Sequence, residues 1–214
     1  MGYLSTLAEV IDEVLYITHG NSTDRDTRIH TRNLVNRSLF EDIQELGDLY
    51  FLEASSTISL NGSKSYSLPS DFRRIAHRGV RIDDWVLDYK TMDWLDENDP
   101  DWDATGDPLY YTIYNDLIWF WPIASSGTVY IRYYKKFTPL TDEADSLASI
   151  PAEWRQILVL GAAYRELKRM KSPDAALYKR DLEELKARLL LRNGRVAGTP
   201  SEPDAEDLLD WFNV

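Results

Sequence analysis

The sequence contains no cysteine among its 214 residues. A disulfide framework, a thiolate metal site and a cysteine nucleophile are therefore excluded. Basic residues are also few, because 24 Lys and Arg stand against 36 Asp and Glu and give a formal net charge of −12. Proteins that read duplex DNA through its grooves carry the opposite balance, since contacts with phosphates need Lys and Arg. The sequence therefore predicts an acidic protein that does not recognise DNA sequence.

Long apolar runs are absent as well. The longest, residues 157–163, is far below the roughly 20 residues that a membrane-spanning helix requires. The first residues, Met1 to Leu4, carry no basic region, so we expect no secretory signal. Because 43% of the residues are hydrophobic, the chain can still bury a core. We expect a soluble protein without membrane contact, made in a reducing cytosol.

The first part of the chain has the spacing of two amphipathic helices. Thr6 and Glu9 form a capping box, and apolar residues follow on one face up to Thr18. A second stripe predicts one helix over residues 25–53, about 43 Å long at the usual rise per residue. Its members are Val35, Leu39, Ile43, Leu46 and Tyr50. A helix of this length indicates a bundle or an assembly.

Helical spacing returns after residue 150. Pro151 suits a first helical turn, and the segment that follows is apolar on nearly all sides, which predicts a central helix. A last helix begins at Ser172 and Pro173 and is expected to end at Gly194. Residues 195–214 contain two prolines and two acidic clusters, so we expect an extended tail there.

The middle of the chain has the period of two that is typical of strands. Asp83–Asp84 and Asn115–Asp116 predict hairpin turns. Alternating residues over 110–114, 117–121 and 129–134 predict a three-stranded antiparallel meander. The expected organisation is N-terminal helices in residues 1–54, a β-rich domain in 55–137, C-terminal helices in 138–194 and the tail in 195–214.

Aromatic residues are concentrated in this meander and occur on both of its faces. One face can form the core, while the other needs a covering helix, a neighbouring subunit or a ligand such as a sugar. The candidates for a subunit contact are Tyr110, Tyr114, Trp119, Trp121, Tyr130 and Tyr134.

An acidic stretch over residues 93–107 partly matches a calcium loop. Asp99, Asp101 and Asp103 occupy the first three ligand positions, but Ala104 stands where glycine is needed and Tyr110 where a bidentate glutamate is needed. A solvated loop is therefore the favoured interpretation, and the sequence leaves cation binding open. No zinc-protease, nucleophile-elbow or phosphate-loop motif occurs, and we expect neither an enzyme nor a cofactor.

Charge is segregated along the chain. Residues 81–116 hold eleven acids and two bases, whereas residues 151–195 hold eleven bases and six acids. Much of the second block suits a solvated helix face. The asymmetry also favours identical subunits in which the acidic loop of one meets the basic helix of the next.

Short motifs in the middle of the chain resemble those of bacteriophage head-to-tail adaptor (connector) proteins. Residues 65–75 contain the pattern Y-x-L-P-x-D-F, and residues 106–111 contain G-x-P-x-x-Y. The segment G-T-V-Y-I-R-Y-Y-K-K, followed by T-P-L-T, is the closest match, and I-P-A-E-W opens the central helix as in that family. The similarity covers residues 55–170 and follows the family's order and spacing.

The resemblance implies an α+β fold, with an antiparallel α-helical bundle and an inserted antiparallel β-sheet domain. It implies a structural virion protein without catalytic residues. Such a protein forms a homo-oligomeric ring, expected to be a dodecamer, that joins the portal protein to tail or nozzle proteins. The ring continues the channel through which viral DNA passes without specific binding. We therefore expect the protein at the head–tail interface of the virion, and in the host cytoplasm before assembly.

The end of the tail predicts a further contact with these partners. Residues 199–214 carry five acids and no base, yet four large apolar side chains lie near the terminus: Leu208, Leu209, Trp211 and Phe212. We interpret them as an anchor that docks on the portal or on a neighbouring subunit. The alternative is that they fold back onto their own subunit.

A carbohydrate-binding β module with helical flanks is the alternative function. It would use exposed tryptophans as a stacking surface, and it would explain the aromatic residues and the acidic loop. It explains neither the long helices nor the tail.

Overall fold

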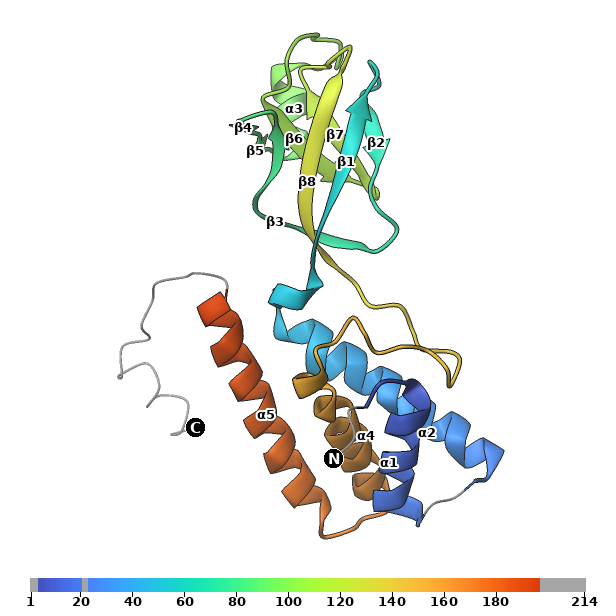
Figure 1. The fold of residues 1–214 in the computed structure, drawn as a ribbon. Helices are drawn as coiled ribbons and strands as arrows, with labels where there is room; N and C mark the ends of the chain where they lie inside the picture. The colour runs from blue at the N-terminus through green and yellow to red at the C-terminus, as the bar shows by residue number, and fades with distance from the viewer. Residues whose placement is uncertain (1–3, 21–22, 197–214) are drawn as a thin grey trace, which may run out of the picture. The chain divides into compact units, whose positions relative to one another are not determined.

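The computed structural model describes residues 4–20 and 23–196 and divides the chain into two compact units (Figure 1). The helical unit consists of Met1–Phe51 and Pro139–Val214, and the β unit is Leu52–Thr138. The predicted α+β class is confirmed. Within the described ranges, no helix is both long enough and apolar enough to span a bilayer.

Helix α1 (Leu7–His19) begins at the predicted capping box. Thr6 Oγ1 accepts a hydrogen bond from the Glu9 amide (3.5 Å), and the Glu9 carboxylate accepts one from the Thr6 amide (3.2 Å). The helix ends at Gly20, whose φ of 61° lies in the left-handed region. Its buried side chains repeat at helical spacing: Leu7, Val10, Ile11, Val14 and Leu15.

The second predicted helix is shorter than expected. α2 (Arg25–Ser38) continues through a π-helical turn, η1 (Leu39–Ile43), and a 3-10 turn, η2 (Gln44–Leu46). It stops there because Gly47 has φ 124° and ψ −142°, which is outside the helical region. The expectation of one helix over residues 25–53 is therefore wrong in its last part. The apolar stripe itself is buried as predicted at Val35, Leu39 and Ile43.

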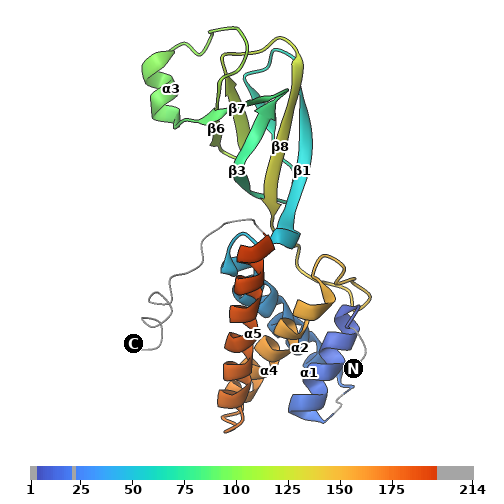
Figure 2. The same ribbon diagram turned by 60° about the vertical axis from the view of Figure 1, so that its left-hand side comes forward.

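Helix α4 (Gln156–Arg169) is the central helix that its composition predicts. It follows a 3-10 turn, η4 (Ala152–Trp154), and packs against α1, α2 and α5 (Figures 1 and 2). Its buried residues are Ile157, Leu158, Val159, Gly161, Ala162, Ala163, Glu166 and Leu167.

Helix α5 (Ala175–Val196) buries Leu182 and Leu189. It runs past Gly194, so the expectation that this glycine ends the helix is wrong. Gly194 does not have a positive φ, and it therefore continues the helix instead of forming a left-handed cap.

The β unit contains two four-stranded sheets that share one core. A 3-10 turn, η3 (Tyr50–Leu52), leads into the first sheet. Its strand order is β1 (Glu53–Leu60), β8 (Gly127–Lys135), β3 (Phe72–Ile82) and β4 (Trp85–Val86). The second sheet has the order β2 (Ser65–Ser67), β7 (Leu117–Trp121), β6 (Tyr110–Tyr114) and β5 (Asp88–Tyr89). The pairs are antiparallel except β5 with β6, which is parallel.

The predicted hairpins form, but the predicted meander does not. Asn115 and Asp116, with φ of 52° and 59°, make the turn between β6 and β7, and Asp83, with φ of 48°, begins the turn between β3 and β4. Strand β8 does not pair with β7 and lies instead between β1 and β3. The alternation of β8 buries Val129 and Ile131 in the shared core in either arrangement, so the pattern alone does not identify the partner strand.

A short helix, α3 (Met92–Asn98), lies in the stretch that was expected to be a solvated loop. Thr91 is its N-cap, and its hydroxyl accepts a hydrogen bond from the Trp94 amide (3.3 Å). Leu95 on this helix is buried, with 1% of its surface exposed. The solvated-loop expectation is therefore wrong for residues 93–98, which form a packed helix, whereas residues 99–107 are not helical and expose Asp101, Asp103 and Asp107.

Candidate functional site

The second sheet has an aromatic outer face that α3 covers. Along β6 and β7, Tyr111 and Phe120 point into the core, while Tyr110 and Trp121 lie on the opposite face. The ring of Trp94 from α3 lies 5.0 Å from that of Tyr110 and 5.7 Å, nearly perpendicular, from that of Trp121. Tyr110 and Trp121 themselves stack at 5.8 Å. A helix of the same subunit thus covers this part of the sheet.

Two acidic residues hold the indoles of this aromatic face in place. Asp99 accepts hydrogen bonds from Trp121 Nε1 (2.7 Å) and from the Ala104 amide (3.0 Å). These bonds, that of Trp121 foremost, lower the pKa of Asp99. Asp96 accepts a bond from Trp102 Nε1 (2.7 Å). Asp99, a calcium-ligand candidate in the sequence, and Asp96, expected in a solvated loop, therefore stabilise the packing of the β unit.

Trp102 covers the rest of the aromatic face. Its ring lies 5.2 Å from that of Trp119 at an interplanar angle of 77°. Beside this pair is a hollow of about 410 Å³. Its lining consists of Lys64, Met92, Asp96, Asp101, Trp102 and Trp119. Trp119 Nε1 finds no hydrogen-bond acceptor among the described residues, so the indole contributes to the site through its ring.

The six aromatic candidates for a subunit contact occupy different surroundings. Tyr114 and Tyr130 are exposed, at 58% and 48%, and stay candidates for contact with a neighbouring copy. Tyr110, Trp119 and Trp121 are half-buried beneath Trp94 and Trp102. Tyr134 is half-buried, with the Arg74 guanidinium 5.9 Å from its ring. The open stacking surface that a carbohydrate module would need is therefore not formed by Trp119 and Trp121.

Sequence reasoning missed other exposed and covering aromatics. Trp85 and Tyr89, on the short strands β4 and β5, are 76% and 56% exposed. Trp94 and Trp102 belong to the acidic stretch, whose charge favours a solvated loop and therefore does not indicate packed aromatic rings. The N-cap at Thr91, followed by Leu95 at helical spacing, is the signal that could have revealed a packed helix there.

The sequence also raises two further candidates, a cation site in the acidic stretch and the tail anchor. In the part of the chain that the structure describes, no three carboxylate or histidine side chains are grouped to hold a metal ion. Residues 197–214 lie outside the described part. The anchor formed by Leu208, Leu209, Trp211 and Phe212 therefore stays a prediction.

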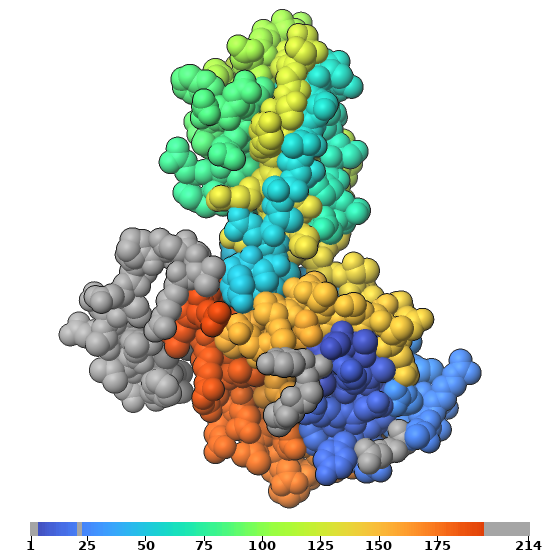
Figure 3. All heavy atoms as spheres, in the orientation of Figure 1, coloured from blue at the N-terminus to red at the C-terminus, as the bar shows by residue number. Residues whose placement is uncertain are grey.

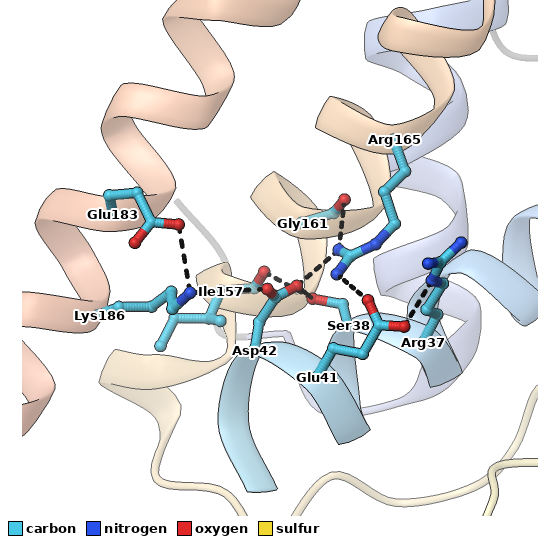
Figure 4. Close-up of polar contacts among 9 residues, drawn as sticks. All are labelled: Arg37, Ser38, Glu41, Asp42, Ile157, Gly161, Arg165, Glu183 and Lys186. Atoms are coloured by element: carbon cyan, nitrogen blue, oxygen red, sulfur yellow. Dashed lines mark hydrogen bonds and ion pairs between the residues drawn. The ribbon is translucent and has the colours of Figure 1, made fainter. Parts of the chain in front are cut away.

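The helical unit contains a buried acidic residue that connects three helical segments (Figure 4). Asp42 in η1, 5% exposed, accepts hydrogen bonds from Arg165 Nη1 on α4 (2.5 Å) and from Ser38 Oγ (2.9 Å). Lys186 on α5 places its Nζ 3.8 Å from the other carboxylate oxygen. Arg165 also donates to Glu41 (2.9 Å). One buried carboxylate thus ties η1, α4 and α5 together.

Gly161 allows the close approach of α4 to the Asp42 cluster. Gly161 on α4 faces Ser38 and Asp42, and a Cβ at this position would lie 2.2 Å from Ser38 Oγ and 2.5 Å from Asp42 Oδ2. Its carbonyl accepts a hydrogen bond from Arg165 Nη1 (2.9 Å), as Figure 4 shows. Glycine is therefore required here for close approach and not for a turn.

A second buried carboxylate ties α1 and α2 to α4. Glu166, 1% exposed, accepts hydrogen bonds from Nε2 of His19 (2.7 Å), from Nε2 of His30 (2.9 Å) and from Arg169 (2.6 and 2.8 Å). The bonds from Arg169 foremost, and those from the two imidazoles, lower the pKa of Glu166 to about 2 against the effect of burial. His19 and His30, on different helices, therefore share one buried partner.

None of these clusters has the geometry of a nucleophile beside a base. The charged groups of the helical unit hold its helices, and the polar groups around α3 hold the aromatic face.

Comparison with known sequences gives the family. No curated protein gives a significant match to the chain. A family model described as SU10 adaptor protein matches residues 5–204, far beyond the segment that carries the sequence motifs. The chain therefore belongs to the SU10 adaptor protein family, which confirms its resemblance to phage head-to-tail adaptors.

Proposed function

We propose that this phage adaptor forms a closed ring that docks on the portal protein and connects it to tail or nozzle proteins. The ring, expected to contain twelve copies, continues the channel through which viral DNA passes. The observation that carries the proposal is the adaptor family match over residues 5–204. In the virion, the protein then lies at the head–tail interface.

The buried networks of the helical unit support a subunit that keeps one shape in a ring. Glu166 binds side chains of α1 and α2, and Asp42 binds side chains of α4 and approaches α5. Removing one partner of such a buried ion pair leaves an uncompensated charge, at a cost of about 3–5 kcal/mol. The helices of this unit are therefore held in one packing, which we propose is the antiparallel bundle that bears the contacts of the ring.

The net charge suits a channel wall. At −12 per chain, copies around the channel repel the phosphates of passing DNA. Contacts that retain DNA need Lys and Arg, which Asp and Glu outnumber in this chain. The free protein should accordingly bind duplex DNA no more tightly than about 10⁻⁴–10⁻⁶ M at physiological salt.

Mass photometry of the adaptor mixed with the portal protein of the same phage tests the proposal. We expect one new species, heavier than the portal by a fixed number of adaptor copies, at saturating adaptor. An unchanged portal mass, or a broad distribution of added copies, would overturn it. A gel shift with DNA at nanomolar adaptor and 150 mM salt would contradict the role as a channel wall.

A further inference from the structure

The outer face of the first sheet in the β unit is basic. Strand β3 contains four Arg and one His and no acid. Val129 and Ile131 of β8 point into the core, so Tyr130 between them lies on the outer face. Arg81 of β3 is the register partner of Tyr130, and Arg132 follows on the same face of β8. Tyr130 is 48% exposed, and Figure 3 shows β8 (yellow) and β1 (cyan) at the surface of the unit.

Two arginines of β3 have no carboxylate partner. Within the residues that the structure describes, neither Arg78 nor Arg81 forms an ion pair, although both side chains are exposed. Arg132, in contrast, binds Glu53 (2.8 Å). We call the surface formed by Arg78, Arg81, Tyr130 and Arg132 the basic face. Its two unpaired guanidinium groups favour a partner that carries negative charge.

The opposite side of the same unit is acidic. The two sheets share one core, so their outer faces point in opposite directions, and α3 lies on the side away from β1 and β8 (Figure 2). Residues 93–107, which include most of α3, contain seven acids and no base. Asp96 and Asp99 bind indoles of their own unit. The other five are exposed, form no ion pair in the described part of the chain, and make up the acidic face: Asp93, Glu97, Asp101, Asp103 and Asp107.

The two faces also complement each other in aromatic surface. The hollow of about 410 Å³ beside Trp102 and Trp119 has Asp101 of the acidic face in its lining. On the basic face, the exposed ring of Tyr130 lies beside Arg81. Aromatic rings pack well against indoles, and a phenol next to a guanidinium matches indoles next to a carboxylate.

Faces on opposite sides of one unit suit a heterologous contact. The basic face of one copy can pack on the acidic face of the next, and that copy keeps its own basic face for a third. A head-to-tail contact of this kind is what a closed ring requires. Contact between two like faces is disfavoured, because it would bring unpaired charges of the same sign together.

We propose that the basic face of the β unit in one copy packs against the acidic face of the β unit in the neighbouring copy of the ring. Arg78 and Arg81 then lie opposite the exposed carboxylates, and Tyr130 lies against the hollow beside Trp102. This contact rests on the proposed ring and specifies an interface within it.

The charge pattern of the sequence favours the basic last helix as the partner of the acidic stretch, and β3 takes the place of that helix here. Four bases of α5 already form ion pairs within their own subunit: Arg180, Lys186, Arg188 and Arg192. The unpaired arginines of β3 therefore match the unpaired carboxylates better than most bases of α5 do.

Charge reversal on the two faces tests the contact. Arg81→Glu and Asp101→Arg each place like charges opposite one another, so each variant should need at least about tenfold more adaptor than the wild type to fill the portal in mass photometry. The double variant restores opposite charges at every interface and should assemble within about twofold of the wild type. Lys179→Glu is the matched control, because Lys179 on α5 is also exposed and without an ion pair among the described residues, and this variant should assemble normally.

The absence of cysteine allows the contact to be detected directly. Single variants Arg81→Cys and Asp101→Cys are mixed in equal amounts, assembled on portal and treated with a short bismaleimide. We expect covalent dimers from the mixture and none from either variant alone. Unchanged melting temperatures verify that each variant is folded.

The outcomes separate the interface from the ring. Dimers from Arg81→Cys alone would indicate a symmetric pair and would overturn the proposal. Impaired assembly of Lys179→Glu with normal assembly of Arg81→Glu would assign the acidic face to α5 and would overturn it too. Complete rings of both single reversal variants at wild-type concentrations would refute this interface while the proposed function stands. If mass photometry of the wild type on portal detects no ring, both proposals fail.

Discussion

The Glu166 carboxylate on α4 accepts a hydrogen bond of 2.7 Å from Nε2 of His19, which lies 147 residues earlier in the chain. The same carboxylate binds His30 and Arg169, so a single buried side chain joins α1, α2 and α4. This contact connects the part of the helical unit before the β unit with the part after it.

Replacing Glu166 tests how much this junction stabilises the fold. Glu166→Gln removes the buried carboxylate that accepts the hydrogen bonds of His19, His30 and Arg169, so we expect a loss of about 1.5–3 kcal/mol in the free energy of unfolding. Glu184→Gln on the exposed face of α5 removes a surface pair and should cost less than about 0.5 kcal/mol. Urea denaturation followed by circular dichroism measures both. Equal effects of the two variants would show that the buried network contributes no more than a surface pair.

The same residue predicts a pH dependence. Its pKa is about 2 in the folded protein and 4.5 ordinarily, so the unfolded chain binds the proton first as the pH falls. The stability that Glu166 contributes is therefore fully present above pH 4.5 and is lost as the pH falls towards 2. Between these values, the difference in unfolding free energy between the wild type and Glu166→Gln should shrink. A difference that stays constant with pH would contradict the assignment.

Gly161 and Gly194 should respond in opposite directions to alanine. Alanine usually stabilises a helix relative to glycine by about 0.5–1 kcal/mol. At Gly161, however, the new Cβ would meet Ser38 Oγ and Asp42 Oδ2, so we expect Gly161→Ala to cost about 1–3 kcal/mol. Gly194 has open space around that position, and Gly194→Ala should stabilise the protein. Thermal melts of the two variants give the sign directly, and a stabilised Gly161→Ala would refute the close approach.

The cover of the aromatic face should matter for stability of the β unit. Trp94→Ala removes the ring that packs on Tyr110 and Trp121, and we expect it to cost about 2 kcal/mol. Trp85→Ala, at a residue 76% exposed, is the control and should cost less than about 0.5 kcal/mol. Hydrogen exchange of β6 and β7 amides distinguishes them, because only the first variant should accelerate exchange there. Similar exchange in both variants would mean that α3 does not protect the sheet.

Removing residues 201–214 tests the tail anchor. If Leu208, Leu209, Trp211 and Phe212 dock on the portal or a neighbouring subunit, the truncated protein should keep its circular dichroism and melting temperature and lose stable attachment to the portal. Repetition around a ring makes even a weak anchor effective through avidity. Full occupancy of the truncated protein on the portal, or a markedly lower melting temperature, would assign the apolar cluster to another role.

Local signals in the sequence predicted local structure well. The capping box of Thr6 and Glu9 starts α1, and Asn115–Asp116 makes the turn between β6 and β7, because each depends on backbone preferences within a few residues. Gly47 ends the helix although the apolar stripe continues to Tyr50, because the stripe indicates burial and not backbone conformation.

Contacts between distant residues could not be predicted in this way. Strand β8 has the same alternation whether it pairs with β7 or lies between β1 and β3. Likewise, nothing near His19 or Asp42 indicates that their partners are Glu166 and Arg165 on α4. The charge of the acidic stretch predicts contact with solvent alone, but Asp99 accepts a hydrogen bond from Trp121.

Electron microscopy of the adaptor assembled on its portal tests the central claim most directly. A reconstruction without imposed symmetry should show one closed ring of adaptor copies, expected to be twelve, around a channel continuous with that of the portal. Each copy should contact two neighbours through different surfaces. Isolated copies on the portal, a twofold-symmetric dimer, or a ring that blocks the channel would contradict the account.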